Sequence, residues 1–250
     1  MADQSLWELF NRHLTKARFV DLTHTFFPGQ PRHPALPDEA VRNVIDFDSE
    51  YSSLVQEFRF VGQWGTHIDP PLHYHQDGAS LDSLPVQQAL LPLVILDIHA
   101  KVAANADATP TLEDVAAWEA AHGRIPQQSF VALRTDWSTR WPDQARMDNV
   151  GSDSFSHRPG WARDVLEFLV DERNIAAIGH ETSDTDTGYA VTAKHDYSLE
   201  RYFLGTGRWQ VELLANLSKV PPAGALIFVG WPKPKGGAGF PVRAIALCDA

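Results

Sequence analysis

Apolar residues at helical spacing predict four helices in this chain. The segment Leu6–Ala17 is amphipathic, with apolar residues three and four positions apart, and Trp161–Glu172 repeats the pattern. A third helix is expected between Thr111 and Gly123, because an aspartate three residues after the threonine forms a capping box and glycine commonly follows a helix end. A fourth helix is expected over Ala193–Leu204, ending at Gly205.

Shorter apolar and β-branched runs predict the strands. Two of them, Val41–Phe47 and Leu54–Val61, alternate with polar residues and are expected to pair as a ribbon. The other expected strands are Phe19–Leu22, Leu93–Ile98, Phe130–Leu133, Ile175–Ile178, Trp209–Leu213, Ala225–Val229 and Val242–Leu247. Because strands and helices do not alternate regularly, a doubly wound sheet and an eightfold barrel are disfavoured. We expect a layered α/β domain with a mixed sheet over residues 18–250, preceded by a helical arm at residues 1–17.

Composition and charge narrow the functional classes. The chain has 250 residues, of which 44% are hydrophobic and 21% charged, so it can bury a full core. Its formal net charge of −11, without a basic run, argues against a nucleic-acid partner. The single cysteine, Cys248, excludes an intramolecular disulfide and a zinc site built on several thiolates. Neither a signal peptide nor a membrane span is indicated, and a cytoplasmic protein is expected.

The strongest chemical signal lies between Gln63 and His75, where three histidines and a carboxylate fall within nine residues. In an extended segment His67 and Asp69 point to the same face, where an imidazole and a carboxylate can share a cation. The prolines at 70 and 71 fix the backbone beyond them and hold His73 at a set distance. An isolated histidine is more often structural than functional, but the framing by Gly-Thr and Pro-x-His favours a metal site.

This segment resembles the motif His-x-Gly-Thr-His-x-Asp-x-Pro-x-His of the cyclase family of metal-dependent hydrolases, which includes bacterial kynurenine formamidase and isatin hydrolase. The match runs from Gln63 to His73 and departs only at the first position. Further similarity lies at Asp21–His24, Ile178-Gly179, Glu212–Leu217 and Pro241–Ala244. The first 15 or so residues lie outside the resemblance.

The resemblance implies a swivelling β/β/α fold and a site for one or two divalent ions, usually zinc or manganese. By position, His67, Asp69, His195 and Glu212 would be metal ligands, and His73 would be the acid–base residue. Gln63 stands where the family has histidine and is a further candidate ligand. Since its amide oxygen is a harder and weaker ligand than imidazole, the site is expected to favour manganese or magnesium, or a single well-occupied ion.

Two further features are expected to lie around the site. The run Gly179–Gly188 carries three acids and a histidine, but it lacks the flanking helices and closing glutamate of a calcium-binding hand. We interpret it as a loop beside the site, with His180 or Asp184 touching substrate, although solvated acids explain it nearly as well. Trp64, inside the motif, is the aromatic residue expected to stack on a flat substrate, with core packing as the alternative.

The expected function is hydrolysis of a small cyclic or aryl amide, lactam or lactone by a metal-activated water. N-Formylkynurenine and isatin are both plausible substrates, with the chain length favouring an isatin-hydrolase-like member. One alternative is a non-haem iron oxygenase using His67, Asp69 and His195 as a facial triad. Another is a non-catalytic metal- or ligand-binding protein on the same scaffold. A homodimer or homotetramer is expected, since family members commonly pair and the N-terminal helix could serve as an arm.

Overall fold

The computed structural model describes residues 5–249, so the first four residues of the predicted arm lie outside the described part. The strands are β1 (Arg18–Asp21), β2 (Ala40–Ile45), β3 (Val55–Arg59), β4 (His67–Asp69), β5 (Leu90–Asp97), β6 (Phe130–Arg134), β7 (Ala177–His180), β8 (Trp209–Glu212), β9 (Ala225–Gly230), β10 (Phe240–Pro241) and β11 (Arg243–Cys248). The α-helices are α1 (Leu6–Leu9), α2 (His99–Ala104), α3 (Leu112–His122), α4 (Gln144–Asp148), α5 (Arg163–Asp171), α6 (Gly188–Lys194) and α7 (Ser198–Gly205). Short 3-10 or π segments are η1 (Phe10–Leu14), η2 (Pro71–His73), η3 (Val86–Ala89), η4 (Trp137–Arg140) and η5 (Leu217–Lys219).

Nine strands form one mixed sheet, which confirms the predicted fold class. The strand order is β1-β11-β9-β5-β6-β7-β8-β4-β10. Strands β5 to β8 run parallel to one another, whereas β1, β11 and β9 on one side and β4 and β10 on the other pair antiparallel. The parallel strands are almost wholly buried, as strands covered on both faces must be, and the site described below lies beside them.

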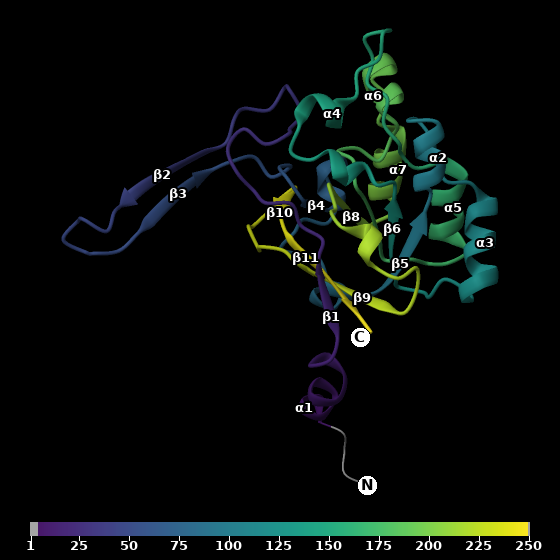
Figure 1. Cartoon of the computed structure of the whole chain (residues 1–250), viewed down its shortest axis with the longest axis horizontal. Helices are drawn as coiled ribbons and strands as arrows, with labels where there is room; N and C mark the ends of the chain where they lie inside the picture. Colours follow the sequence, from purple (N-terminus) through teal and green to yellow (C-terminus); the bar gives the residue numbers. More distant parts are fainter. Residues whose placement is uncertain (1–4, 250) are drawn as a thin grey trace.

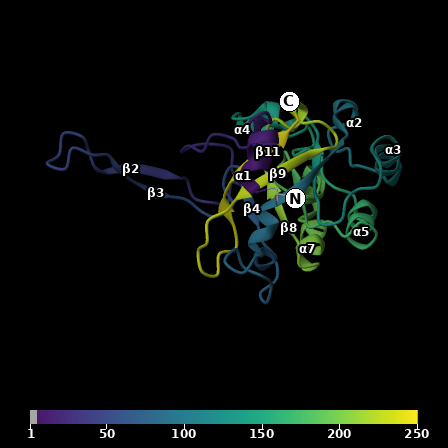
Figure 2. The same ribbon diagram turned by 90° about the horizontal axis from the view of Figure 1, so that it is seen from below.

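Helices α2, α3 and α5 stand together on one side of the sheet (Figures 1 and 2). Helix α5 buries Val165, Leu166 and Leu169 in a core cluster that also contains Val131 and Leu133 of β6. The second core cluster lies on the other face of the sheet and includes alternate residues of β5, β9 and β11. The apolar stripe of α5 therefore explains why this helix covers the central strands.

The predicted capping box of α3 is confirmed. Thr111 accepts a hydrogen bond from the backbone of Asp114, whose side chain in turn accepts one from the Thr111 backbone. Gly123 ends the helix with a positive φ of 87°, a conformation that a residue with a side chain would adopt only with strain. The sequence thus predicts both ends of this helix correctly.

The helix predicted over Ala193–Leu204 is wrong as a single element, because the chain forms two helices, α6 and α7. His195 has a φ of 52° and ends α6 in the left-handed region. Asp196 accepts a hydrogen bond from the backbone of Ser198, and Asp186 accepts two from the backbone of Leu199 and Glu200. These carboxylates accept hydrogen bonds from the first backbone N–H groups of α7. The chain therefore ends one helix, makes a turn and begins a second helix, where a single continuous helix was expected.

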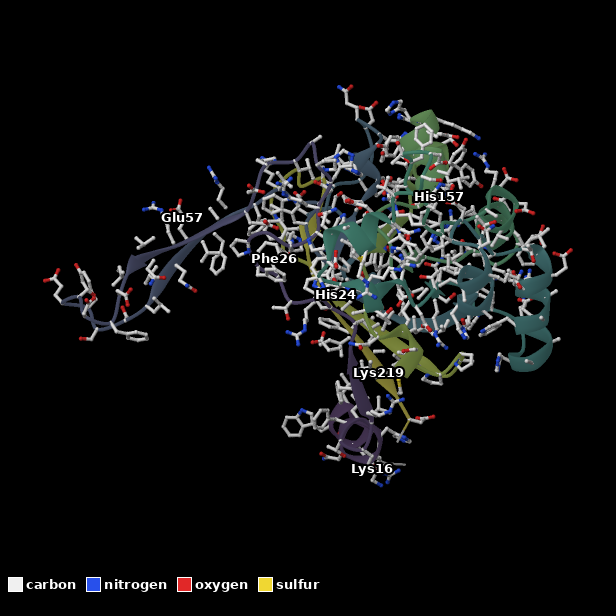
Figure 3. All side chains as sticks on the ribbon, turned by 45° about the horizontal axis from the view of Figure 1, so that its top comes forward. Lys16, His24, Phe26, Glu57, His157 and Lys219 are labelled. Atoms are coloured by element: carbon white, nitrogen blue, oxygen red, sulfur yellow. The ribbon has the colours of Figure 1, made fainter. Side chains whose placement is uncertain are left out.

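Two extensions leave the body of the molecule. Helix α1 and η1 project beyond β1 (Figure 1). Strands β2 and β3 pair as the predicted antiparallel ribbon, which extends away from the body (Figures 1 and 2). Figure 3 shows Glu57 on the ribbon and Lys16 on the arm, both far from His24 in the body. Their exposed large apolar residues are Leu6, Trp7, Leu9, Phe10, Val44, Phe47, Tyr51, Leu54, Val55 and Phe58. Among the described residues, no helix combines the length and apolar character that crossing a membrane requires.

Candidate metal and substrate site

Two neighbouring strands place four polar side chains on one face of the sheet. Strand β4 pairs antiparallel with β8 so that His67 lies opposite Glu212 and Asp69 lies opposite Gln210. Since side chains alternate along a strand and directly opposed residues share a face, all four project to the same side. The predicted ligands His67, Asp69 and Glu212 therefore meet, although 143 residues separate Asp69 from Glu212.

His67 is oriented with one ring nitrogen toward the carboxylates. Its Nδ1 lies 2.9 Å from the carbonyl oxygen of Gly65, while its Nε2 lies 3.2 Å from Asp69 Oδ2 and 3.5 Å from Glu212 Oε2. With Nδ1–H donated to the Gly65 carbonyl, the Nε2 lone pair is free to bind a cation. One ligand atom from each of the three residues lies within 4.8 Å of the others, and all three side chains are buried.

The electrostatics of this group fit a bound cation. Burial and the neighbouring carboxylate of Glu200 raise the pKa of Glu212 well above its usual range. Burial by itself would lower the pKa of His67, but the Asp69 carboxylate outweighs it and raises that pKa. Asp69 Oδ2 is buried and accepts no hydrogen bond among the described residues. Buried charge of this kind is costly unless it is paired or coordinates a metal, and nitrogen and oxygen donors suit a divalent ion.

A second possible metal group adjoins the first. It consists of Asp69, His73 and Glu200, again with one ligand atom from each within 4.8 Å of the others. The 3-10 segment η2 begins after Pro70 and places His73 at its end, so that His73 Nε2 lies 3.8 Å from Glu200 Oε1. His73 is partly exposed, whereas Glu200 is buried in α7. The site thus offers either two adjacent ion positions or one ion beside a free imidazole.

Gln63 contacts these residues through its amide nitrogen. That nitrogen donates to the Ala238 carbonyl at 2.9 Å and to Asp69 Oδ1 at 3.2 Å, and it lies 3.4 Å from His73 Nδ1. Two oxygen acceptors fix the amide orientation, since an amide oxygen could not donate to either. In this arrangement Gln63 is a hydrogen-bond donor to a candidate ligand, whereas coordination would require its oxygen to face the ion.

His180 and Trp64, both expected to touch substrate, lie in the interior. Neither lines the cavity described below. His180 Nδ1 accepts a hydrogen bond from the Trp161 indole, and its Nε2 lies 3.4 Å from Glu212 Oε1. Burial and the neighbouring His67 lower the pKa of His180 to about 3, so its imidazole is neutral. Trp64 is 1% exposed, which favours the core-packing alternative for this residue.

His195 is not brought to the site. It is exposed at the end of α6 and lines a separate surface groove together with His75, Arg163 and Arg201. The turn that breaks the predicted helix carries this side chain away from β4 and β8. Neither the four-ligand set with His195 nor the iron triad of His67, Asp69 and His195 is therefore assembled, which removes the geometric basis for the oxygenase alternative.

A cavity of about 470 Å³ opens onto the candidate metal groups. Its apolar walls are formed by Pro31, Pro34, Leu36, Trp137, Met147, Val150, Val191 and Leu213. His67, His73, Glu200 and Glu212 also line it, which places the candidate metal groups within reach of a small bound molecule. The loop that follows β1, which carries Pro28, Pro31, Pro34 and Pro37, supplies one wall.

Three cavity residues were missed or undervalued in the sequence. Glu200 stands three and four positions before Phe203 and Leu204, so it lies on the buried stripe of α7, where a carboxylate is unusual. Trp137 lies in the cavity wall with its indole N–H donated to the Met147 carbonyl at 3.1 Å. Arg158 pairs with Asp184, and both are buried cavity residues. The Glu200 signal was present in the sequence pattern, whereas the other two depend on loop conformations.

Comparison with known proteins agrees with the site. Residues 20–187 match the family model Cyclase. The chain is 30% identical to isatin hydrolase of Roseibium aggregatum over 241 residues, which cover 91% of this chain and 90% of that protein. Solved structures with the same fold include isatin hydrolase A from Ralstonia solanacearum, with a TM-score of 0.90, 31% identity and 99% of each chain covered. Another is an isatin hydrolase bound to the product analogue thioisatinate, with a TM-score of 0.91, 28% identity and the whole of both chains covered. The chain, with its His67, Asp69 and Glu212 cluster at the floor of an apolar cavity, belongs to the Cyclase family of metal-dependent hydrolases.

Proposed function

We propose that this protein hydrolyses a small, flat cyclic amide of the isatin type, using a divalent metal held by His67, Asp69 and Glu212. The observation that carries the proposal is the buried His67, Asp69 and Glu212 group at the floor of a cavity with apolar walls. The similarity to isatin hydrolase over nine-tenths of both chains supports the substrate class. Manganese or zinc is the proposed ion, in one or two positions. A second ion at Asp69, His73 and Glu200 would occupy the imidazole of His73, so the proton transfer described next belongs to the site with one ion.

The chain supplies substrate binding and proton transfer. When bound, the divalent ion lowers the pKa of its water and polarises the substrate carbonyl. The loop that follows β1 contributes Pro31, Pro34 and Leu36 to the cavity wall, an apolar surface that accommodates an aromatic ring and excludes water from it. His73, whose Nε2 lies 3.8 Å from Glu200 Oε1, accepts the proton of the attacking water and delivers it to the leaving nitrogen. Gln63 restrains both Asp69 and His73 through its amide nitrogen.

Turnover of isatin before and after metal removal tests this proposal. The protein is dialysed against a chelator, and the rate of ring opening is then followed with no addition, with manganese and with zinc. We expect the rate to decrease as the chelator removes the metal. It should recover when either manganese or zinc is added back. The Asp69→Asn variant should bind less metal, whereas the exposed Asp77→Asn variant in the next turn should match the parent. Full activity in the metal-free protein would refute the proposal.

Hydrolysis also separates the proposal from the non-catalytic alternative. A protein that only binds ligands would bind metal tightly and turn over no member of a panel of cyclic amides, aryl formamides and lactones. The panel further distinguishes isatin from N-formylkynurenine, because the second substrate carries a flexible amino-acid tail. We expect the ring amide to be preferred, since the cavity walls are largely apolar.

We also propose that the protein pairs with a second copy of itself. The arm and the ribbon leave the body and carry ten exposed large apolar residues, which a monomer would leave in water. An identical partner could cover them with the same surfaces. Sedimentation of the full chain at micromolar concentration should show a dimer or tetramer, and a monomer would refute this proposal. The cytoplasmic location expected from the sequence stays a prediction.

A further inference from the structure

Gln210 completes the square of polar residues on β4 and β8, but it belongs to neither candidate metal group. Its side chain is wholly buried, with an exposed fraction of 0%. The amide nitrogen donates to Glu200 Oε1 at 2.9 Å and to Glu212 Oε1 at 3.0 Å. One amide group therefore contacts a carboxylate from each of the two metal groups, one on α7 and the other on β8.

The orientation of this amide is itself fixed. Gln210 Oε1 accepts a hydrogen bond of 2.7 Å from the hydroxyl of Thr185, which is also wholly buried. Carboxylates that bind a metal are ionised and have no proton to donate, so a flipped amide would turn its oxygen toward two groups that offer it no hydrogen bond. Both hydrogens of the amide therefore face Glu200 and Glu212, and Thr185 holds the opposite end.

Asp186, the residue after Thr185, holds Glu200 in place by hydrogen bonds to the backbone of α7. Asp186 accepts hydrogen bonds of 3.1 Å from the backbone N–H groups of Leu199 and Glu200 at the start of α7. Asp186 is 2% exposed and follows Thr185 directly. The acidic run that the sequence analysis interpreted as a loop beside the site thus contacts Glu200 twice, once through Gln210 and once through the helix backbone.

From these contacts we propose that Gln210, oriented by Thr185, is a positioning residue that holds Glu200 and Glu212 at the separation which metal binding requires. A neutral donor between two carboxylates keeps them close without adding charge. By engaging Oε1 of Glu212, it leaves Oε2, the oxygen nearer to His67, directed at the metal position. This proposal rests on the proposed function, since it assigns Gln210 a role in binding the same metal.

The Gln210→Met and Thr185→Val variants test it without relying on turnover. Methionine has a similar length and volume but donates no hydrogen bond, and valine removes only the hydroxyl that orients the amide. Outer partners of metal ligands typically change affinity about 10–100-fold when replaced. We expect the manganese dissociation constant to rise by about that factor in Gln210→Met and less in Thr185→Val. The electron paramagnetic resonance spectrum of bound manganese should change in both.

Two controls separate positioning from general damage to the fold. Thr185→Ser retains the hydroxyl and should restore the parent affinity. Thr182→Val removes another buried hydroxyl, which donates to the Asp184 carbonyl at 3.1 Å, and should leave manganese affinity unchanged. If Gln210→Met does not fold, as judged by circular dichroism, the pair Thr185→Val and Thr185→Ser decides the question.

If Gln210→Met folds and binds manganese with the affinity and spectrum of the parent protein, the proposal for Gln210 is wrong, while the proposed function stands. If Gln210→Met does not fold, the same result in Thr185→Val has this meaning. If the parent protein bound neither manganese nor zinc, the proposed function would fail as well. The two failures are therefore distinguishable in one set of metal titrations.

Discussion

Replacing His73 by alanine tests whether this histidine transfers protons or binds metal. The side chain is 28% exposed, and its ring nitrogens lie 3.4 Å from Gln63 Nε2 and 3.8 Å from Glu200 Oε1. These contacts are long, so their loss should affect folding little. General acid–base catalysis contributes about 10²–10⁴ in rate, which corresponds to about 3–5 kcal/mol of transition-state stabilisation. We therefore expect kcat to fall by that factor while one metal ion remains bound at His67, Asp69 and Glu212.

The assay combines initial rates of isatin ring opening with the metal content of the same samples. His75→Ala is the matched control, because His75 belongs to the same segment but bonds to the Arg201 carbonyl at 2.8 Å and lines the separate groove. It should retain both activity and metal. A His73→Ala protein with full turnover and bound metal would remove His73 from the mechanism. Loss of all metal from that variant would instead make it an essential ligand and contradict the proton-transfer role.

Three further predictions concern stability. Burial lowers the pKa of His24 to about 4 from 6.5, against the opposing effect of Asp21. Between these values the unfolded chain binds a proton that the folded chain does not, so stability should fall as the pH drops from 6.5 to 4. The loss is at most about 3 kcal/mol, and urea titrations should show it reduced in His24→Phe, which retains an aromatic ring beside Trp141. Leu169→Ala, at a wholly buried position of α5, should cost about 2–5 kcal/mol in urea unfolding with manganese affinity unchanged. Removing the metal should lower the melting temperature, because an ion at 100 times its dissociation constant stabilises the folded state by about 2.7 kcal/mol.

The predicted site residues that the structure brings together include two whose placement depends on local geometry alone. His67 and Asp69 are two residues apart on a strand, and the alternation of side chains alone places them on one face. Glu212 was identified through the resemblance, and the register of β4 against β8 explains its position opposite His67. The ribbon, α3 and α5 were likewise predicted because each depends on a periodic pattern or a capping residue within its own segment.

The errors occur where contacts between distant residues decide the conformation. The break between α6 and α7 depends on Asp186 bonding to Leu199 and Glu200, thirteen and fourteen residues away. This contact turns His195 outward and buries Glu200, so that one unpredicted turn changes two assignments. Trp64 lies in the bend before β4 and is 1% exposed, and its position inside a functional motif does not indicate whether its side chain faces the cavity or the core.

The polar face of β4 and β8 has a stability cost that the rest of the fold must offset. Histidine, two carboxylates and an amide lie buried on β8 and β4, the seventh and eighth of the nine strands, where apolar side chains would pack without a desolvation penalty. The two core clusters on the faces of the sheet consist of buried apolar residues, so the polar group on β4 and β8 differs from the rest of the interior. Burial and the neighbouring carboxylates raise the pKa of both Glu200 and Glu212, the direction expected where ionised carboxylates are crowded together without a cation. A bound divalent ion removes this penalty, and we therefore infer that the same residues that weaken the metal-free fold are the ones that bind the metal.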